Sequence, residues 1–187
     1  RLHDGRYHGA GDWPPSPARL YQALVAGVGL SGPIPEAVGE AFRWLESLSA
    51  PEIIVPQYRT TTGYTNYVPN NDLDAMKGDP KQIGGIRTGK TIRVRLFDQA
   101  GPMRYIWKFR NNEESQAYAQ NIVETAERLY QFGRGVDFAW AVGEIINEGR
   151  LAELREFEGF TRFSPDSGSR GLTLASPISG SFQSLKD

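Results

Sequence analysis

Residues 57–74 bring together the three kinds of side chain that hold single-stranded RNA. The sequence QYRTTTGYTNYVPNNDLD contains a cation at Arg59, aromatic rings at Tyr64 and Tyr67, and amides at Asn70 and Asn71. Cations contact phosphates, rings stack on bases, and amides or hydroxyls bond base edges and the 2′-hydroxyl. The segment therefore favours RNA binding. The alternative is that its Tyr and Asn side chains only hold a long loop in shape.

The residues that follow this segment extend its positive charge. The whole chain has a net charge of −1, but residues 57–95 contain seven basic and three acidic side chains, a local balance of +4. Contact with phosphates requires such a local basic region, and the charge of the whole chain can hide it. A solvated charged loop is the alternative. We add these residues to the predicted RNA-binding set: Arg87, Thr88, Lys90, Arg93 and Arg95.

Residues 84–91 have the glycine spacing of a phosphate-binding loop. The run GGIRTGKT places its first glycine five residues before the Gly-Lys pair. A true P-loop opens a helix, however, whereas residues 91–97 alternate as a strand does. We therefore favour a basic strand edge that meets RNA phosphates over nucleotide hydrolysis.

A group near the start of the chain offers an alternative, catalytic function. His8 could move a proton to or from a reacting hydroxyl beside Tyr7, and Lys90 could stabilise the charged intermediate. These residues would make the domain a metal-independent endoribonuclease. The sequence does not show that they meet, and ordinary surface roles are the simpler interpretation.

Composition narrows the remaining classes of function. With no cysteine and only two histidines, we predict no thiolate or zinc site, no other metal site and no cofactor. The lack of cysteine fits a reducing, cytoplasmic location. No apolar run approaches the roughly 20 residues of a membrane span. A length of 187 residues suits a single domain.

The helices are marked by clear start and stop signals. Ser16 and Pro17 predict a cap and a first helical position, and Gly32-Pro33 ends that helix. A second helix is predicted from Pro35 to before Pro51, and a third from the cap Asn112 to Gly133.

The strands are predicted from runs that are apolar or alternate with period two. Residues 1–4, 53–55 and 139–146 are expected as strands, and residues 91–97 and 103–109 as a hairpin around a turn at 98–102. Residues 57–90 carry no helical stripe and are expected as a long inserted loop. This order predicts an α+β, ferredoxin-like (RRM-like) split βαβ domain, whose open sheet face can bind RNA.

Several motifs together resemble a known family. They are GRYHG at 5–9, WPPSPARL at 13–20, GYTNYVPNNDLD at 63–74, IRTGK at 86–90 before a basic strand, and LTLASP at 172–177 with Gly180-Ser181. This set resembles the first half of the fused Cas five/six subunit of type I-G (formerly I-U) CRISPR systems.

The resemblance implies a role in the Cascade effector complex of antiviral defence. The chain would be a single Cas five-like domain that holds the 5′ handle of the CRISPR RNA beside the backbone subunits and the large subunit. Residues 57–90 would form a projecting thumb, and 147–187 a tail leading to a second domain. We expect the chain to be a piece of a longer protein, with the first strand clipped at Arg1 and the repeat-cleaving half beyond Asp187. A pure protein-docking module is a further alternative.

Overall fold

The computed structural model describes most of the chain. It covers residues 2–3, 13–69, 81, 87–97, 101–133, 138–156, 158–166 and 172–186, with the backbone alone at 2–3, 68–69, 88, 90 and 92.

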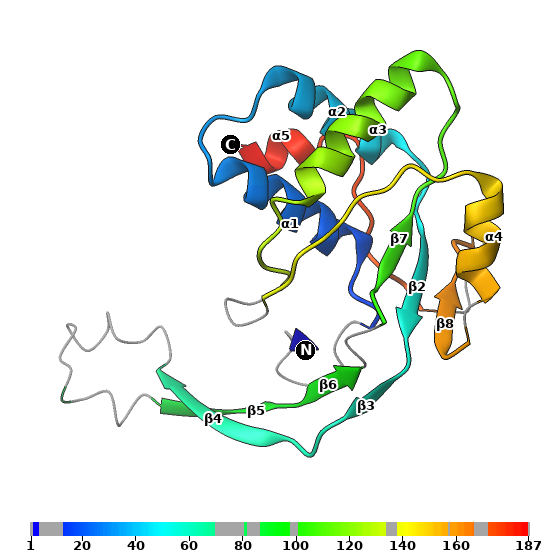
Figure 1. Cartoon of the computed structure of the whole chain (residues 1–187). Coiled ribbons are helices and arrows are strands. Elements are labelled where there is room, and N and C mark those ends of the chain that lie inside the picture. Colours follow the sequence, from blue (N-terminus) through cyan, green and yellow to red (C-terminus); the bar gives the residue numbers. More distant parts are fainter. Residues whose placement is uncertain are drawn as a thin grey trace.

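Four helices pack together into a helical body (Figure 1). These are α1 (Pro17–Gly29), α2 (Glu36–Ser47), α3 (Glu113–Ala126) and α5 (Ser181–Lys186), while α4 (Glu148–Glu156) lies apart, beside the sheet. The predicted caps are confirmed. The Ser16 hydroxyl accepts from the Arg19 N–H at 3.3 Å, and the Asn112 amide oxygen accepts from the Ser115 N–H at 2.8 Å. Each satisfies an N–H that has no partner within its helix.

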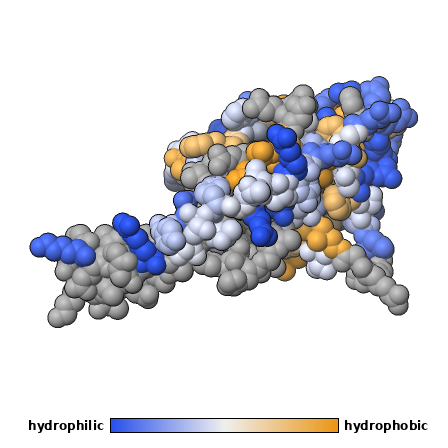
Figure 2. Space-filling model, turned by 90° about the horizontal axis from the view of Figure 1, so that it is seen from below, coloured by the Kyte–Doolittle hydropathy of each residue, from blue (hydrophilic) through white to orange (hydrophobic). Residues whose placement is uncertain are grey.

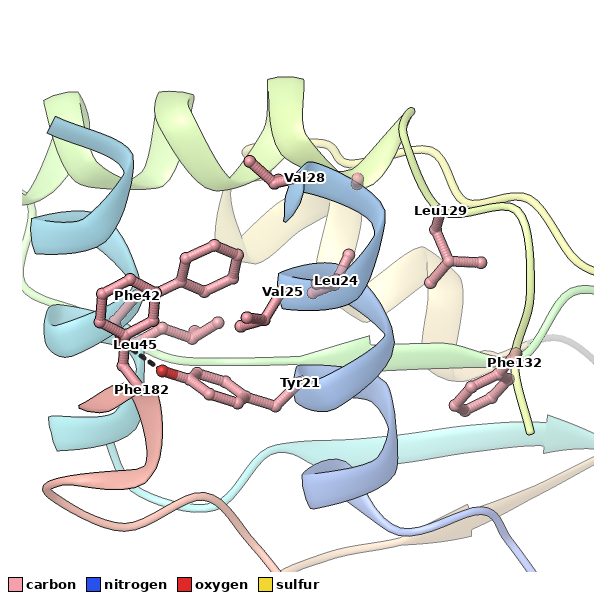
Figure 3. Packing of buried hydrophobic residues seen from close by; sticks show 10 residues of the cluster. Tyr21, Leu24, Val25, Val28, Phe42, Leu45, Leu129, Phe132 and Phe182 are labelled. Atoms are coloured by element: carbon pink, nitrogen blue, oxygen red, sulfur yellow. Dashed lines mark hydrogen bonds between the residues drawn. The ribbon is translucent and has the colours of Figure 1, made fainter. Parts of the chain in front are cut away.

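The core of this body is aromatic and aliphatic (Figure 3). Tyr21 of α1 lies edge-on to Phe42 of α2, and Phe182 of α5 stacks on Phe42 with ring centroids 5.6 Å apart. The Tyr21 hydroxyl donates to the Phe42 carbonyl at 3.2 Å. The other buried side chains of the cluster are Leu24, Val25, Val28, Leu45, Ala126, Leu129 and Phe132.

A buried carboxylate fastens α5 to the other helices. Glu46 accepts from the backbone N–H groups of Gly180 and Phe182, both at 2.8 Å, and from the Tyr21 hydroxyl at 3.1 Å. Burial raises the pKa of Tyr21, and the charge of Glu46 raises it further. The tyrosine therefore remains a donor, and the carboxylate is satisfied by three donors from two segments that are distant from it in sequence.

The strands are antiparallel throughout the described residues, in three small sheets. In the first, β2 (Glu52–Pro56) lies between β7 (Arg104–Ile106) and β8 (Phe160–Phe163). In the second, β6 (Val94–Phe97) lies between β1 (Leu2–His3) and β3 (Tyr58–Thr60). The third pairs β4 (Tyr64–Pro69) with β5 (Arg87–Ile92).

Strands β3 to β6 form a long two-stranded ribbon, residues 58–69 and 87–97, which we call the β-arm. It leaves the sheet at the end of β2 and curves beneath and away from the helical body (Figure 1). Seen from below, it projects from the body, and its described outer part carries hydrophilic and neutral side chains (Figure 2).

The predicted α+β class is confirmed, and the architecture is compatible with a ferredoxin-like split βαβ domain. The first two helices and the strand at 53–55 are confirmed. The prediction of a long loop at 57–90 is wrong for the residues that the structure describes there, because residues 58–60, 64–69 and 87–90 lie in strands.

The predicted hairpin is also wrong. Strand β6 pairs with β1 and β3, whereas β7 pairs with β2 in a different sheet. Local alternation identifies a strand but not its partner, and here β6 continues the ladder of the β-arm.

Two predictions for the second half of the chain fail as well. The third helix ends at Ala126, and Gly133, with φ 127°, lies in the irregular segment that carries Leu129 and Phe132 into the core. Residues 139–146 form no strand. The predicted tail at 147–187 contains α4, β8 and α5.

Glu52, at the start of β2, forms a partly buried ion pair across the chain. Its carboxylate accepts from Nε of Arg155 at 3.0 Å and also from Nη2 of that residue. The Arg155 hydrogen bonds hold the pKa of Glu52 below its usual value, against the opposing effect of burial. The pair joins α4 to the central strand of its sheet.

This pair makes stability depend on pH. Because the pKa of Glu52 is lower in the folded than in the unfolded state, its stabilisation is present above the unfolded pKa of about 4.3 and is lost as pH falls through the folded value. We expect Glu52→Gln to flatten the acid limb of a plot of unfolding free energy against pH. At pH 7 it should cost about 2 kcal/mol, since removing one partner leaves the other uncompensated.

The exposed pair Arg150–Glu153, 2.7 Å apart, provides the control. Glu153→Gln should change the unfolding free energy little, since solvent screens such pairs. Equal effects of the two substitutions would contradict a special role for Glu52.

Candidate nucleic-acid interface

The outer part of the β-arm is a regular ladder of six residue pairs. It runs from Tyr64 opposite Ile92 to Pro69 opposite Arg87. Residues directly opposite in an antiparallel ladder share a face, and neighbours along a strand alternate. Tyr67 and Arg87 therefore lie on one face of the ribbon, and Tyr64 and Asn66 on the other. Both faces present polar or aromatic groups.

The β-arm contains a bulge, with one more residue on its first strand than on its second. The ladder pairs Thr60 with Arg95 and resumes with Tyr64 opposite Ile92, which leaves three residues on one strand against two on the other. Thr61 bridges the gap: its N–H donates to the Val94 carbonyl at 2.9 Å, and its hydroxyl accepts from the Val94 N–H at 3.1 Å. Such a bulge kinks and twists a ribbon, and this one lies where the arm curves.

Two glycines let longer side chains lie across the ribbon. A Cβ on Gly63 would come within 2.8 Å of the Thr91 methyl and 3.2 Å of Arg93 Cγ. A Cβ on Gly89 would lie 3.1 Å from the Thr65 methyl and 3.4 Å from the Tyr67 ring. The stem of Arg93 and the ring of Tyr67 therefore rest on backbone. Such cross-strand packing stabilises a glycine site in a sheet.

Tyr67 nevertheless presents most of its ring to solvent. Its side chain is 69% exposed and that of Tyr64 is 40% exposed. Exposed rings held by a ribbon are suited to stacking on bases, which is largely independent of base identity. Thr65 and Asn66, between the two tyrosines, are exposed as well and can hydrogen bond.

The root of the arm is an aromatic cluster that includes one predicted RNA ligand. The Trp13 ring lies 4.5 Å from that of Tyr58 and 5.9 Å from that of Phe97. The guanidinium of Arg95 lies over Trp13 and Tyr58, at 5.7 and 5.5 Å. Arg95 is 7% exposed, so it differs from the other predicted cations and acts in packing the root. Trp13 therefore has a packing role at the root of the arm.

The remaining predicted residues divide into three groups. Arg59, Arg87 and Arg93 are exposed on the β-arm. Thr88 and Lys90 lie in β5, opposite Val68 and Asn66. The others lie outside the described residues: Asn70 and Asn71, and the catalytic alternative Tyr7 and His8. The catalytic alternative of Tyr7, His8 and Lys90 therefore stays a prediction.

Charge distinguishes the β-arm from the rest of the chain. Its two strands contain five basic residues and no Asp or Glu. The five are Arg59, Arg87, Lys90, Arg93 and Arg95. The residues that join the strands add two Lys and three Asp, so the run 58–97 has a net charge of +4 on a chain of net charge −1 and concentrates a positive field.

Sequence reasoning missed Thr65, Asn66 and Thr91, which the ladder places among these residues. The available signal was the high content of Tyr, Thr and Val in residues 58–68, which favours strands.

Comparison with known proteins decides the family. The sequence model of the CRISPR-associated protein, GSU0054 family, matches residues 1–187. The chain belongs to this family. No curated protein and no solved structure matches the chain. In the described ranges, no helix is both long and apolar enough to cross a membrane.

We expect the aromatic cluster at the root to stabilise the β-arm against local opening. Trp13→Ala should lower the unfolding free energy by about 2 kcal/mol, less than for a fully buried Trp because Trp13 is only half-buried. It should also speed amide exchange at residues 58–60 and 95–97. Trp140, which is 83% exposed, is the matched control, and Trp140→Ala should change stability by less than about 0.5 kcal/mol. Unchanged exchange in the arm of the Trp13 variant would contradict this role.

Proposed function

We propose that this CRISPR-associated protein is an RNA-binding scaffold subunit that grips CRISPR RNA with the β-arm. The observation that carries the proposal is the combination of three exposed arginines, Arg59, Arg87 and Arg93, with two exposed tyrosines on a projecting ribbon whose strands contain no acidic residue. Phosphate neutralisation and base stacking are the two sources of affinity for single-stranded RNA, and the arm has groups for both.

The finer assignment follows the family resemblance. The chain would serve a type I-G Cascade in the cytoplasm, hold the 5′ handle of the CRISPR RNA, and lie beside the backbone subunits and the large subunit. Membership of a CRISPR-associated family supports the general part of this assignment, a role in a CRISPR system.

The β-arm is long enough for an extended RNA strand to lie along it. Twelve residues at about 3.3 Å each give a ribbon about 40 Å long before its bend is considered. Arg59 lies near the root, Arg93 at the bulge and Arg87 at the far end of the described ladder. Cations spread along the arm in this way can meet successive phosphates of one extended strand.

The test removes charge from the arm and measures the salt dependence of binding. Repeat RNA and a scrambled RNA are titrated with the wild type and with Arg59→Ala/Arg87→Ala/Arg93→Ala, at several salt concentrations without metal. The plot of log K against log salt has a negative slope, and each lost phosphate contact reduces its magnitude by about 0.7 for a single strand. The magnitude of the slope should therefore be smaller by about 2 in the triple variant.

The control removes the same charge elsewhere. Arg110, Arg128 and Lys186 are exposed outside the β-arm, and their triple alanine variant should bind as the wild type does. If both triple variants had equal slopes, the arm would not be the RNA site. The RNA carries a label at each end, so cleavage is visible. Cut RNA with a cyclic phosphate would instead favour the endoribonuclease alternative of Tyr7, His8 and Lys90.

A further inference from the structure

Residues 138–146, which precede α4, form an apolar strip with its large side chains facing outward. Phe138, Trp140 and Val142 are 74%, 83% and 84% exposed. Ala139 and Ala141, which lie between these residues, and Gly143, which follows them, are half-buried. This alternation is that of an extended chain with one face on the body. A surface strand normally has the opposite pattern, with its large apolar residues inward.

The strip cannot turn over to bury these side chains. Ala139 and Ala141 pack against the core cluster, and a Cβ on Gly143 would lie 2.6 Å from Cα of Val123 in α3. Only small residues fit at these inward positions. A shift by one residue would drive the rings into the helix, so the outward orientation is fixed by packing.

The backbone of the strip is open as well. The N–H of Ala139 donates to the Tyr130 carbonyl at 3.1 Å, but residues 140–146 make no backbone hydrogen bond to the part of the chain that the structure describes. An extended segment with free N–H and C=O groups can pair with another strand. The apolar side chains and the open backbone thus point to the same kind of partner.

The charge next to the strip distinguishes protein from RNA as that partner. Residues 144–158 contain five Glu and two Arg, and both arginines already pair with carboxylates: Arg150 with Glu153, and Arg155 with Glu52. This flank repels phosphates and attracts cations. It contrasts with the acid-free β-arm.

We propose that the strip is a docking edge for an extended segment of another protein subunit. That segment is apolar at alternating positions and carries Lys or Arg where it passes Glu144. It adds as a strand beside residues 139–146, its backbone supplies hydrogen bonds, and its side chains cover Phe138, Trp140 and Val142. The site is separate from the RNA-binding arm.

Hydrogen exchange tests the docking edge in the protein as it assembles. The tagged chain is compared alone, with repeat RNA, and in the ribonucleoprotein that co-purifies with it. We expect the amides of 140–146 to exchange fast in the first two samples and at least about tenfold more slowly in the third. Phe138→Ser/Trp140→Ser/Val142→Ser should abolish incorporation of the protein partner and leave RNA affinity unchanged.

The control variant loses exposed apolar side chains that lie outside the strip. Leu30→Ser/Leu172→Ser/Ile178→Ser removes as many exposed apolar side chains elsewhere and should assemble normally. Fast exchange of 140–146 in the assembly, or the absence of any co-purifying protein, would overturn the proposal. Protection by RNA alone would show a nucleic-acid site. Protection that grows with the concentration of the isolated chain would show a second copy as the occupant.

Discussion

One run of chain, residues 52–69, contributes a strand to each of the three sheets, and the rest of the architecture depends on this sharing. Its first part, β2, is buried and lies between β7 and β8, whereas β3 and β4 extend the same run into the β-arm. Because β3 follows β2 directly in the chain, the contacts that fix β2 in its sheet also fix the position of the arm. Glu52 and Arg155 fasten β2 to α4, and Trp13 packs on the first residue of β3. The bulge at 61–63 then sets where the arm bends.

This arrangement separates two surfaces of opposite charge on a nearly neutral chain. The β-arm has no acidic residue, whereas residues 144–158 have an excess of Glu. If basic and acidic residues were mixed on one surface, the acidic ones would weaken binding of an anionic strand and the basic ones would weaken binding of a cationic segment. In the proposed scaffold, their separation would allow contact with RNA and protein at the same time. The buried carboxylate of Glu46 keeps α5 on the helical body and so completes the core opposite the arm.

Local signals in the sequence predicted the helices well, because Ser16 and Asn112 act through contacts within four residues. Strand partners were predicted poorly, since the alternation of residues 91–97 does not specify whether β3 or β7 pairs with them. Composition identified the exposed groups Arg59, Tyr67 and Arg87. It could not show that Arg95 is buried, because that depends on Trp13, which is 82 residues away and packs at the root of the arm. The sequence predicted a strand at residues 139–146 but not the outward orientation of Trp140 and Val142, since nothing local reveals that Val123 blocks the other face.

The most direct test of the central claim is to map RNA contacts by ultraviolet crosslinking and mass spectrometry. Tyr64 and Tyr130 have similar exposure, 40% and 45%, but only Tyr64 lies on the β-arm. Repeat RNA bound to the wild-type chain should crosslink to Tyr64 or Tyr67, and Tyr130 should remain unmodified. Crosslinks confined to the helical body, with the tyrosines of the arm unmodified, would contradict the account.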